Sequence, residues 1–582
     1  MHKSRKIMRR ESQSTLNLPE CPAVLRRVYA NRNISRPDQL DYSVQGLLPF
    51  TLMNGIETAA DIVAEAVMQQ QRILIIGDYD ADGATSTALV LLALRGFGAS
   101  HTDYLVPNRF EYGYGLTPAI VEVAAARNPE LVITVDNGIS SIDGVNTAHA
   151  HGMRVVITDH HLAGRELPTA DAIVNPNQPG CEFPEKSIAG VGVAFYLMLA
   201  TRARLRELGW FAAQARDEIN MAGLLDLVAL GTVADVVPLE KNNRLMVQQG
   251  LQRIRLRQCS FGIQALMQAA AKDISQCTSA DFGFFVAPRL NAAGRLDDMS
   301  AGIECLLADD MSKAMALAEQ LHELNSERRQ IESGMLDDAM QHLDELIKSV
   351  DEDQLPLGLC LYDNSWHQGV VGLLASRIKE RFHRPVIAFA DANTDDPRNN
   401  EIKGSARSIP GLHIRDVLDA VATRHPGLIQ KFGGHAMAAG LSLDKSGYDD
   451  FKSAFETEVA RQLSSETLEN VIYSDGAIGN DEMSLQTAAA IRMAGPWGQQ
   501  FPEPVFDDVF EIVSWRIVGE KHLKMQLRQQ DASQVLDAIA FNYTDADLPA
   551  GCDRVRAAYR LDVNEFRGNR KLQLIVEYVE AV

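Results

Sequence analysis

The chain has 582 residues, of which 46% are hydrophobic and 23% are charged, as in an ordinary globular protein. This length is enough for about three or four domains. The 56 Lys and Arg residues and 77 Asp and Glu residues give a formal net charge of −21. That charge argues against a protein that coats nucleic acid, but it is compatible with an enzyme that has a local basic groove.

No part of the sequence has the length and apolar character of a membrane span. The basic N-terminus, MHKSRKIMRRESQS, has no apolar core after it and does not resemble a secretory signal. The seven cysteines form no CxxC pair and have no regular spacing, which predicts reduced thiols in a cytoplasmic protein.

Residues 1–70 contain no chemistry-bearing motif and are expected to be largely helical. From residue 72 onward, short apolar segments alternate with helical ones. Strands are predicted at 73–76, 103–106, 131–135, 154–157 and 172–174. This βαβ alternation predicts an open parallel sheet, which binds ligands at the carboxyl ends of its strands.

Three carboxylates at alternate positions, Asp78, Asp80 and Asp82, follow the first predicted strand, and a helical segment comes next. Ionised groups this close together repel each other, and burying any one of them is costly. Hard oxygen ligands at this density favour Mg²⁺ or Mn²⁺. The alternative is a solvated acidic turn that binds no metal.

Polar residues follow later apolar segments in the same way. Asp136 follows the strand predicted at 131–135, and His160 and His161 come shortly after the strand at 154–157. Asp235 ends the apolar stretch LLDLVALGTVA. Because the carboxyl ends of parallel strands meet at one edge of a sheet, these side chains are predicted to converge on a metal site.

Four motifs occur in a characteristic order: DYDADG (78–83), VDNG (135–138), TDHH (158–161) and GTVADVVPL (231–239). They resemble the motifs of the DHH phosphoesterase superfamily. Four further motifs resemble the RecJ branch of that superfamily, the bacterial single-strand-specific 5′→3′ DNA exonucleases: PRLNAAGR (288–295), WHQGVVG (366–372), KGSARS (403–408) and KFGGHAMAAG (431–440). The resemblance covers essentially the whole chain and implies hydrolysis of single-stranded DNA to 5′-mononucleotides in DNA recombination and repair.

In this superfamily two Mn²⁺ or Mg²⁺ ions share a bridging carboxylate and acidify the water that attacks the phosphodiester. The resemblance implies six ligands: Asp78, Asp80, Asp82, Asp136, His160 and Asp235. Asp136 would be the bridge and a catalytic residue. His161 would position the substrate or the water. Many superfamily members have a histidine where this chain has Ile76, which leaves the role of Asp78 open.

Seven residues are expected to contact the substrate: Arg109, Tyr114, Arg289, Arg295, Ser405, Arg407 and His435. Arg109 would clamp a phosphate with its planar guanidinium, and Tyr114 would stack on a base. The alternatives are a solvated arginine and a packed tyrosine. The resemblance implies that Arg289 and Arg295 reach the substrate cleft and that the other three act from a second domain.

The sequence predicts an α/β protein with a parallel-sheet DHH metal domain, a long connecting helix, a smaller α/β DHHA1 domain and a C-terminal all-β, OB-like barrel. The predicted regions are an N-terminal helical segment (1–70), the catalytic domain (71–260), the connector (261–350), the DHHA1 substrate-binding domain (351–465) and the nucleic-acid-binding barrel (466–582). A long connecting helix is predicted. The sequence leaves open whether this helix is continuous or broken near Ser333. KGSARS and GGHAMAAG are expected to be glycine-rich loops.

Two other functions remain open. One is a phosphodiesterase for very short oligonucleotides or cyclic dinucleotides, or a pyrophosphatase, although a small substrate does not need the C-terminal barrel. The other is a metal-free scaffold, although all six ligand positions are filled. The resemblance implies a single-strand-binding protein and a RecQ-type helicase as partners and no membrane association. A monomer is expected because the sequence has no coiled-coil or repeat pattern.

Overall fold

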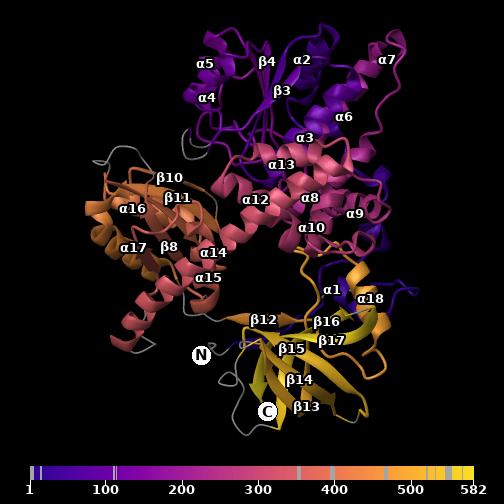
Figure 1. Cartoon of the computed structure of the whole chain (residues 1–582), viewed down its shortest axis with the longest axis vertical. Helices are drawn as coiled ribbons and strands as arrows, with labels where there is room; N and C mark the ends of the chain where they lie inside the picture. The colour runs from indigo at the N-terminus through magenta and orange to yellow at the C-terminus, as the bar shows by residue number, and fades with distance from the viewer. Residues whose placement is uncertain are drawn as a thin grey trace.

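The structure is a computed structural model, and it describes residues 5–12, 16–108, 112, 115–349, 356–392, 400–434, 436–463, 470–519, 522–530, 532–543, 553–566 and 568–582. Figure 1 shows three bodies: a sheet-and-helix domain at the top, a second sheet domain to its lower left and a barrel at the bottom. Helix α14 (Met311–Ser349) leads from the first body to the second. No helix among the described residues is long and apolar enough to cross a membrane.

The first domain is built on five parallel strands, as the sequence predicted. They are β2 (Ile73–Gly77), β3 (Thr102–Leu105), β4 (Leu131–Val135), β5 (Arg154–Thr158) and β6 (Ala172–Val174), in the order β3-β2-β4-β5-β6. Successive side chains of β2 face opposite sides of the sheet, so Ile73 and Ile75 pack in one core and Leu74 and Ile76 in another. Both faces are therefore buried, which explains the continuous apolar runs.

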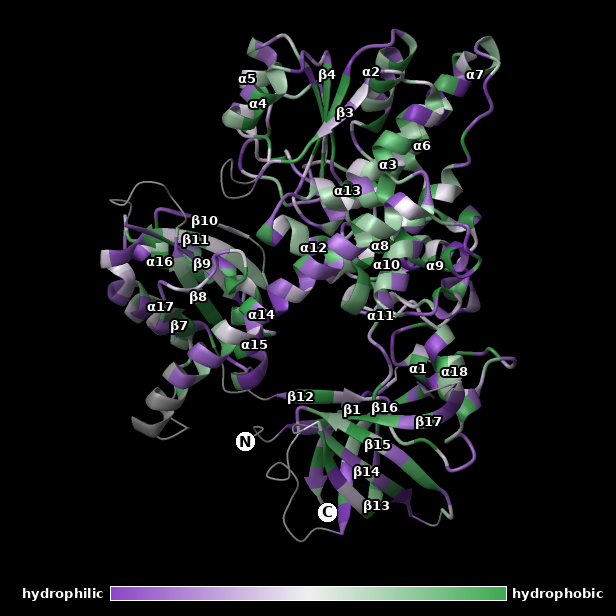
Figure 2. Ribbon diagram, viewed as in Figure 1, coloured by the Kyte–Doolittle hydropathy of each residue, from purple (hydrophilic) through white to green (hydrophobic). Residues whose placement is uncertain are grey.

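Helices cover both faces of this sheet. One core contains α2 (Ile56–Met68), α3 (Ala81–Phe97) and α6 (Gly190–Glu207), and the other contains α4 (Pro118–Ala125) and α5 (Ile142–Ala150). In Figure 2 helices α3, α6 and α8 are mostly green, as expected for buried helices. The strand order reverses beside β2, because β3 lies on one side of it and β4 on the other. Ligands bind at such a switch point.

A helical region follows the first sheet. Its helices are α7 (Trp210–Ala213), α8 (Leu225–Ala234), α9 (Lys241–Arg255), α10 (Phe261–Ala269), α11 (Ser279–Asp281), α12 (Ala287–Leu296) and α13 (Ser300–Leu307). A π-helical turn, Phe282–Val286, leads into α12. Helix α14 runs without interruption through Ser333 and Gly334, so the connecting helix has no break there.

The second domain has a mixed sheet in the order β10-β11-β9-β8-β7. Its strands are β7 (Leu359–Tyr362), β8 (Val386–Asp391), β9 (Glu401–Arg407), β10 (Lys431–Gly434) and β11 (Ala438–Asp444). Its helices are α15 (Val371–Phe382), α16 (Ile414–Arg424) and α17 (Tyr448–Gln462).

The prediction of loops at KGSARS and GGHAMAAG was wrong for most of both motifs, because they form strands β9, β10 and β11. Gly404 pairs with Leu441 within the sheet. A Cβ on Gly404 would lie 2.4 Å from the Phe389 ring, so this glycine provides space for a buried aromatic side chain.

The C-terminal strands close into a barrel in the order β13-β14-β15-β17-β16. They are β13 (Phe506–Val518), β14 (His522–Gln529), β15 (Val535–Phe541), β16 (Arg554–Phe566) and β17 (Asn569–Ala581). This architecture confirms the predicted all-β barrel.

The N-terminal segment is attached to the barrel and is not only helical. Strand β1 (Lys6–Arg9) pairs in parallel with β12 (Val471–Ser474). After α1 (Ala23–Ala30), Arg32 makes a buried ion pair with Asp475, with a distance of 3.0 Å between Nη1 and Oδ1. Helix α18 (Leu485–Met493) packs against the barrel strand β16. The short 3₁₀ turns among the described residues are Pro37–Leu40, Val44–Gly46, Phe50–Leu52, Met221–Leu224, Ile274–Gln276 and Lys445–Gly447.

Candidate metal centre

The three carboxylates after β2 lie in a tight turn that begins α3. Asp80 caps the helix, because its Oδ1 accepts hydrogen bonds from the backbone N–H groups of Asp82 (2.9 Å) and Gly83 (3.0 Å). A Cβ on Gly83 would lie 2.4 Å from the carbonyl oxygen of Asp78, so only glycine fits there. Asp78 and Asp82 are both buried.

A second helix N-terminus holds Asp82. Its two carboxylate oxygens accept hydrogen bonds from the backbone N–H groups of Gly190 (2.7 Å) and Val191 (2.9 Å), at the start of α6. The positive end of a helix dipole favours a carboxylate at this position. A Cβ on Gly190 would lie 2.7 Å from Asp136, so α6 also packs closely against the next acidic residue.

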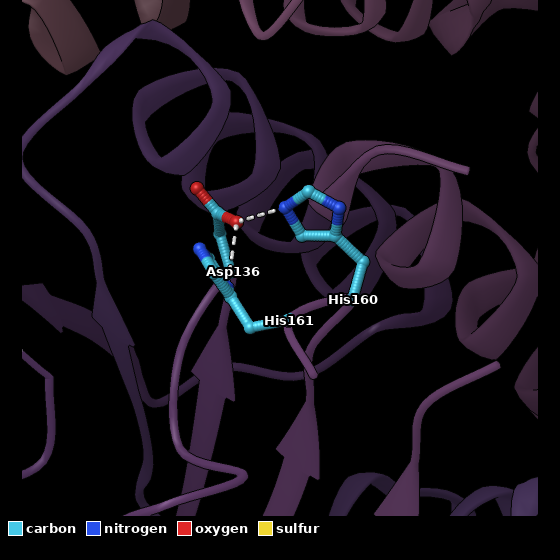
Figure 3. Close-up of side chains that lie close together, drawn as sticks. All are labelled: Asp136, His160 and His161. Carbon is cyan, nitrogen blue, oxygen red and sulfur yellow. Dashed lines mark ion pairs between the residues drawn. The ribbon is translucent and has the colours of Figure 1, made fainter. Parts of the chain in front are cut away.

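Asp136 follows β4, and Figure 3 shows its carboxylate beside the imidazoles of His160 and His161. Its backbone has a φ of 61°, a left-handed conformation that few residues other than glycine and asparagine adopt readily. Its Oδ1 lies 3.1 Å from His160 Nε2 and 4.0 Å from His161 Nδ1. One carboxylate oxygen of Asp136 thus faces both imidazoles.

Asp235 completes the cluster from the C-terminal end of α8 rather than from a strand. His160 Nε2 lies 3.5 Å from Asp235 Oδ2 and 4.0 Å from Asp82 Oδ2. Three groups of side chains therefore have ligand atoms within 4.8 Å of one another: Asp82, His160 and Asp235; Asp78, Asp80 and Asp136; and Asp136, His160 and His161. All six residues expected as ligands belong to these groups, and Asp136 and His160 each belong to two of them.

The cluster carries more negative charge than its surroundings neutralise. Burial, together with the neighbouring carboxylates, raises the pKa of Asp82 to about 7 and that of Asp235 to about 8. Burial and the same neighbours raise the pKa of Asp136 well above its usual range. Oxygen and imidazole donors at these separations suit a divalent cation, which would relieve this repulsion.

The sequence analysis gave no role to Asp159, the first residue of the DHH triplet. Asp159 is buried, and its Oδ1 lies 2.7 Å from His161 Nδ1. Burial alone would raise the pKa of Asp159, but the hydrogen bond and the charge of His161 lower it. In return, Asp159 overcomes the effect of burial on His161 and raises its pKa to about 9. The position of Asp159 in the TDHH motif was the signal for this role.

Helix α12, which carries PRLNAAGR, supports the carboxylate turn from outside the sheet. Asn291 Oδ1 accepts a hydrogen bond of 2.8 Å from the Ala81 backbone N–H. A Cβ on Gly294 would lie 1.7 Å from the carbonyl oxygen of Tyr79, between Asp78 and Asp80. The sequence analysis did not assign either residue, although the motif contains both.

Arg289, which was expected to reach the substrate cleft, lies buried in the helical region. Its guanidinium contacts the Phe285 carbonyl oxygen (2.5 Å) and His322 Nδ1 (2.9 Å). Arg295, at the other end of the motif, donates to the carbonyl oxygen of Gly369 (3.1 Å) in the second domain.

Ser405 and Arg407 lie on β9 of the second domain, and Arg407 Nη1 donates to Ser405 Oγ (3.0 Å). A Cβ on Gly372 would come within 2.9 Å of both side chains, so this glycine of WHQGVVG leaves room for them. Gly369 of the same motif contacts the backbone of Arg295. The motifs therefore form a continuous line of contacts from the metal cluster to β9. Arg109, Tyr114 and His435 lie outside the described residues.

The contact of Gly294 with the carboxylate turn makes a testable prediction. Gly294→Ala is expected to lower kcat/KM at least about a hundredfold, because the added methyl group must displace the turn and errors of about 1 Å have such effects. Activity on single-stranded DNA and the unfolding midpoint would be measured together. Gly223→Ala is the control, since its Cβ would meet nothing within 4 Å. Unchanged activity would show that α12 does not fix the turn.

Comparisons with known proteins are consistent with this geometry. Family models match over residues 72–232 (DHH family, N-terminal domain), 356–461 (DHHA1 domain) and 474–578 (RecJ OB domain). The chain is 53% identical to the single-stranded-DNA-specific exonuclease RecJ of Dickeya dadantii, over 98% of each chain. It is 51% identical to the RecJ of Escherichia coli, again over 98% of each.

Two solved structures of RecJ from Thermus thermophilus have the same fold. The complex with Mn²⁺ matches with a TM-score of 0.80 and 28% identity, covering 100% of this chain and 80% of that chain. The complex with Mg²⁺ matches with a TM-score of 0.74 and 27% identity, covering 99% and 79%.

Proposed function

This chain belongs to the RecJ family of single-stranded-DNA-specific exonucleases, and from this we propose that it degrades single-stranded DNA from the 5′ end to 5′-mononucleotides with two Mn²⁺ or Mg²⁺ ions. The observation that carries the proposal is the convergence of two ligand groups. Asp136 belongs to the group with Asp78 and Asp80, and its Oδ1 lies 3.1 Å from Nε2 of His160, which belongs to the group with Asp82 and Asp235.

In the proposed site Asp136 would be a ligand of both ions. Asp82, His160 and Asp235 would hold one ion with it, and Asp78 and Asp80 would hold the other. Two divalent ions, when bound, acidify water and neutralise the charge that develops on the phosphate. The two carboxylate oxygens of Asp82 already accept hydrogen bonds from α6, which fixes the orientation of this ligand before any ion binds.

His161 is proposed to contact the substrate rather than to act as a ligand. Its Nδ1 is held by Asp159 at 2.7 Å, so Nε2 is the ring atom that we assign to the substrate phosphate. The raised pKa of His161 favours the imidazolium form, which donates a charge-assisted hydrogen bond to a phosphate oxygen. Asp159 acts through His161 as a positioning residue.

The substrate contacts are proposed to continue from the catalytic domain across its boundary with the second domain. Arg295, Ser405 and Arg407 lie along the contacts that link the carboxylate turn to β9. Arginine binds phosphate through parallel N–H groups, so these side chains suit the DNA backbone. Arg109, Tyr114 and His435 remain proposed substrate contacts on the basis of the family resemblance.

We propose that each of the five regions predicted from the sequence is a functional unit. The barrel is proposed to bind the DNA strand at a distance from the metal site. A role in recombination and repair in the cytoplasm is proposed, with a single-strand-binding protein and a RecQ-type helicase as partners. We propose that the chain acts as a monomer.

Product analysis tests the polarity and the reaction. The substrate is a single-stranded oligonucleotide with a 5′ phosphate and a label at one end or the other. With Mn²⁺, we expect early release of the 5′ label as a mononucleotide and gradual shortening of the 3′-labelled strand. Early release of 3′ mononucleotides would contradict the polarity. Cleavage of only the shortest oligomers would instead support a small-substrate phosphodiesterase.

A further inference from the structure

A pocket of about 520 Å³ lies next to the carboxylate turn. Its walls come from the π-helical turn Phe282–Val286, α12, α14 and α15, so both the catalytic region and the second domain contribute to it. One wall residue, Asn291, is the side chain that accepts the hydrogen bond from Ala81 in the carboxylate turn. The pocket therefore adjoins the proposed metal centre, and its volume lies in the range of about 300–1,000 Å³ that is common for ligand sites.

The pocket is basic although the whole chain is acidic. Four arginines and one glutamate line it, which gives a formal charge of +3 in a chain of net charge −21. The arginines are Arg295, Arg328, Arg329 and Arg377. The glutamate, Glu332, is neutralised locally, since its carboxylate contacts Arg328 on α14 and Arg377 on α15 (2.9 Å). A concentrated positive charge in an acidic protein attracts an anionic ligand.

Two further side chains indicate what kind of anion fits. Phe284 lines the pocket and is 70% exposed, which is unusual for a large aromatic side chain. Arg329 lines the same pocket, is exposed and makes no ion pair among the described residues. An aromatic face beside a guanidinium is the combination that proteins use for single-stranded nucleic acid, where a base stacks on the ring and a phosphate binds the cation.

We propose that this cavity, the Phe284 pocket, holds a part of the DNA strand beyond the nucleotides that bind at the metal centre, with a base stacked on Phe284 and a phosphate bound by Arg329. The inference rests on the proposed function and adds a specific binding site to it. Neither contact identifies a base, so the pocket binds any sequence. A dinucleotide held at the metals is too short to fill the pocket as well, so its contribution depends on strand length.

Equilibrium binding tests the pocket without hydrolysis. The full chain with Asp136→Asn would be titrated against a 5′-phosphorylated, 3′-labelled oligothymidylate in EDTA, with anisotropy as the readout. Phe284→Ala is expected to weaken binding about tenfold, and Phe284→Tyr is expected to restore it, because any aromatic ring can stack. Arg329→Gln is expected to reduce the slope of log K against log salt by about 0.7, the value for one phosphate contact on a single strand.

Two control variants match these changes at sites away from the pocket. Phe261→Ala removes another partly exposed phenylalanine, and Arg415→Gln removes an exposed arginine on α16. Both are expected to bind like the parent protein. If Phe284→Ala and Arg329→Gln also bind like the parent, the pocket does not hold the strand.

Kinetics on substrates of different length separate the pocket from the reaction. In an otherwise wild-type chain with Mn²⁺, Phe284→Ala is expected to lower kcat/KM about tenfold for a long oligothymidylate and to leave dithymidylate unchanged. Equal losses of kcat/KM on both substrates would contradict strand binding by the pocket and leave the exonuclease assignment intact. A wild-type chain and an Arg415→Gln control that hydrolyse no single strand would instead overturn the proposed function.

Discussion

Replacing Asp136 with asparagine is expected to reduce kcat on single-stranded DNA by at least about a thousandfold, while the chain remains folded. Asp136 belongs to one candidate ligand group with Asp78 and Asp80 and lies 3.1 Å from His160 of the other, and an amide cannot supply the bridging negative charge. A thousandfold loss corresponds to about 4 kcal/mol, which is within the several kcal/mol that a divalent ion contributes at a transition state. Asparagine is preferred to alanine because residue 136 has a φ of 61°.

The stability of this variant separates a local effect from misfolding. Without metal, Asp136→Asn is expected to unfold at the wild-type midpoint or above it, because it removes one buried charge from a group of mutually repelling carboxylates. Asp217→Ala, which removes an exposed acidic residue outside the cluster, is the control and should retain wild-type activity. Near wild-type turnover by Asp136→Asn would contradict the bridging role.

Removal of divalent ions is expected to abolish hydrolysis and to lower the thermal unfolding midpoint by a few degrees. The buried carboxylates of Asp82, Asp136 and Asp235 repel one another without a cation, so an ion that binds only the folded state stabilises it. Adding Mn²⁺ or Mg²⁺ to the EDTA-treated chain should restore both properties. A differential scanning measurement with and without Mn²⁺ follows the stability independently of activity.

The same titration on Asp136→Asn is the matched control for this second prediction. Its midpoint should rise less with Mn²⁺ than that of the wild type, because one shared ligand has lost its charge. Full activity in excess EDTA would contradict a metal site at this cluster. An equal rise of the unfolding midpoint with Mn²⁺ in the wild type and in Asp136→Asn would contradict it as well.

The first sheet and its ligand edge could be predicted because the sequence carries two independent signals there. Buried parallel strands such as 131–135 need continuous apolar runs, and charged residues at their ends, such as Asp136, are too costly to bury without a partner. Asp235 was placed correctly in the cluster, although the element before it is a helix. An apolar run alone does not distinguish a buried strand from a buried helix.

The missed and wrong assignments depend on contacts that sequence spacing does not encode. Arg289 contacts a carbonyl oxygen and a histidine ring inside the helical region through its two terminal nitrogens, which no motif reveals. Asp159 and Asn291 act by accepting hydrogen bonds from neighbours, so their roles appear only when the partners are positioned. The glycine-rich sequence around Gly404 predicted a loop. In β9 this glycine instead leaves space for the Phe389 side chain of the adjacent strand β8.

The pairing of β1 with β12 has a consequence for the order in which the protein can be assembled. Lys6 is paired with Val471, so the partner of the first strand is translated near the end of synthesis. At about 5–20 residues per second, the N-terminal strand waits roughly half a minute or longer on the ribosome before it can pair. During that time its backbone N–H and C=O groups face solvent or a chaperone. The catalytic sheet can form earlier, but the first strand becomes native only after β12 has been translated.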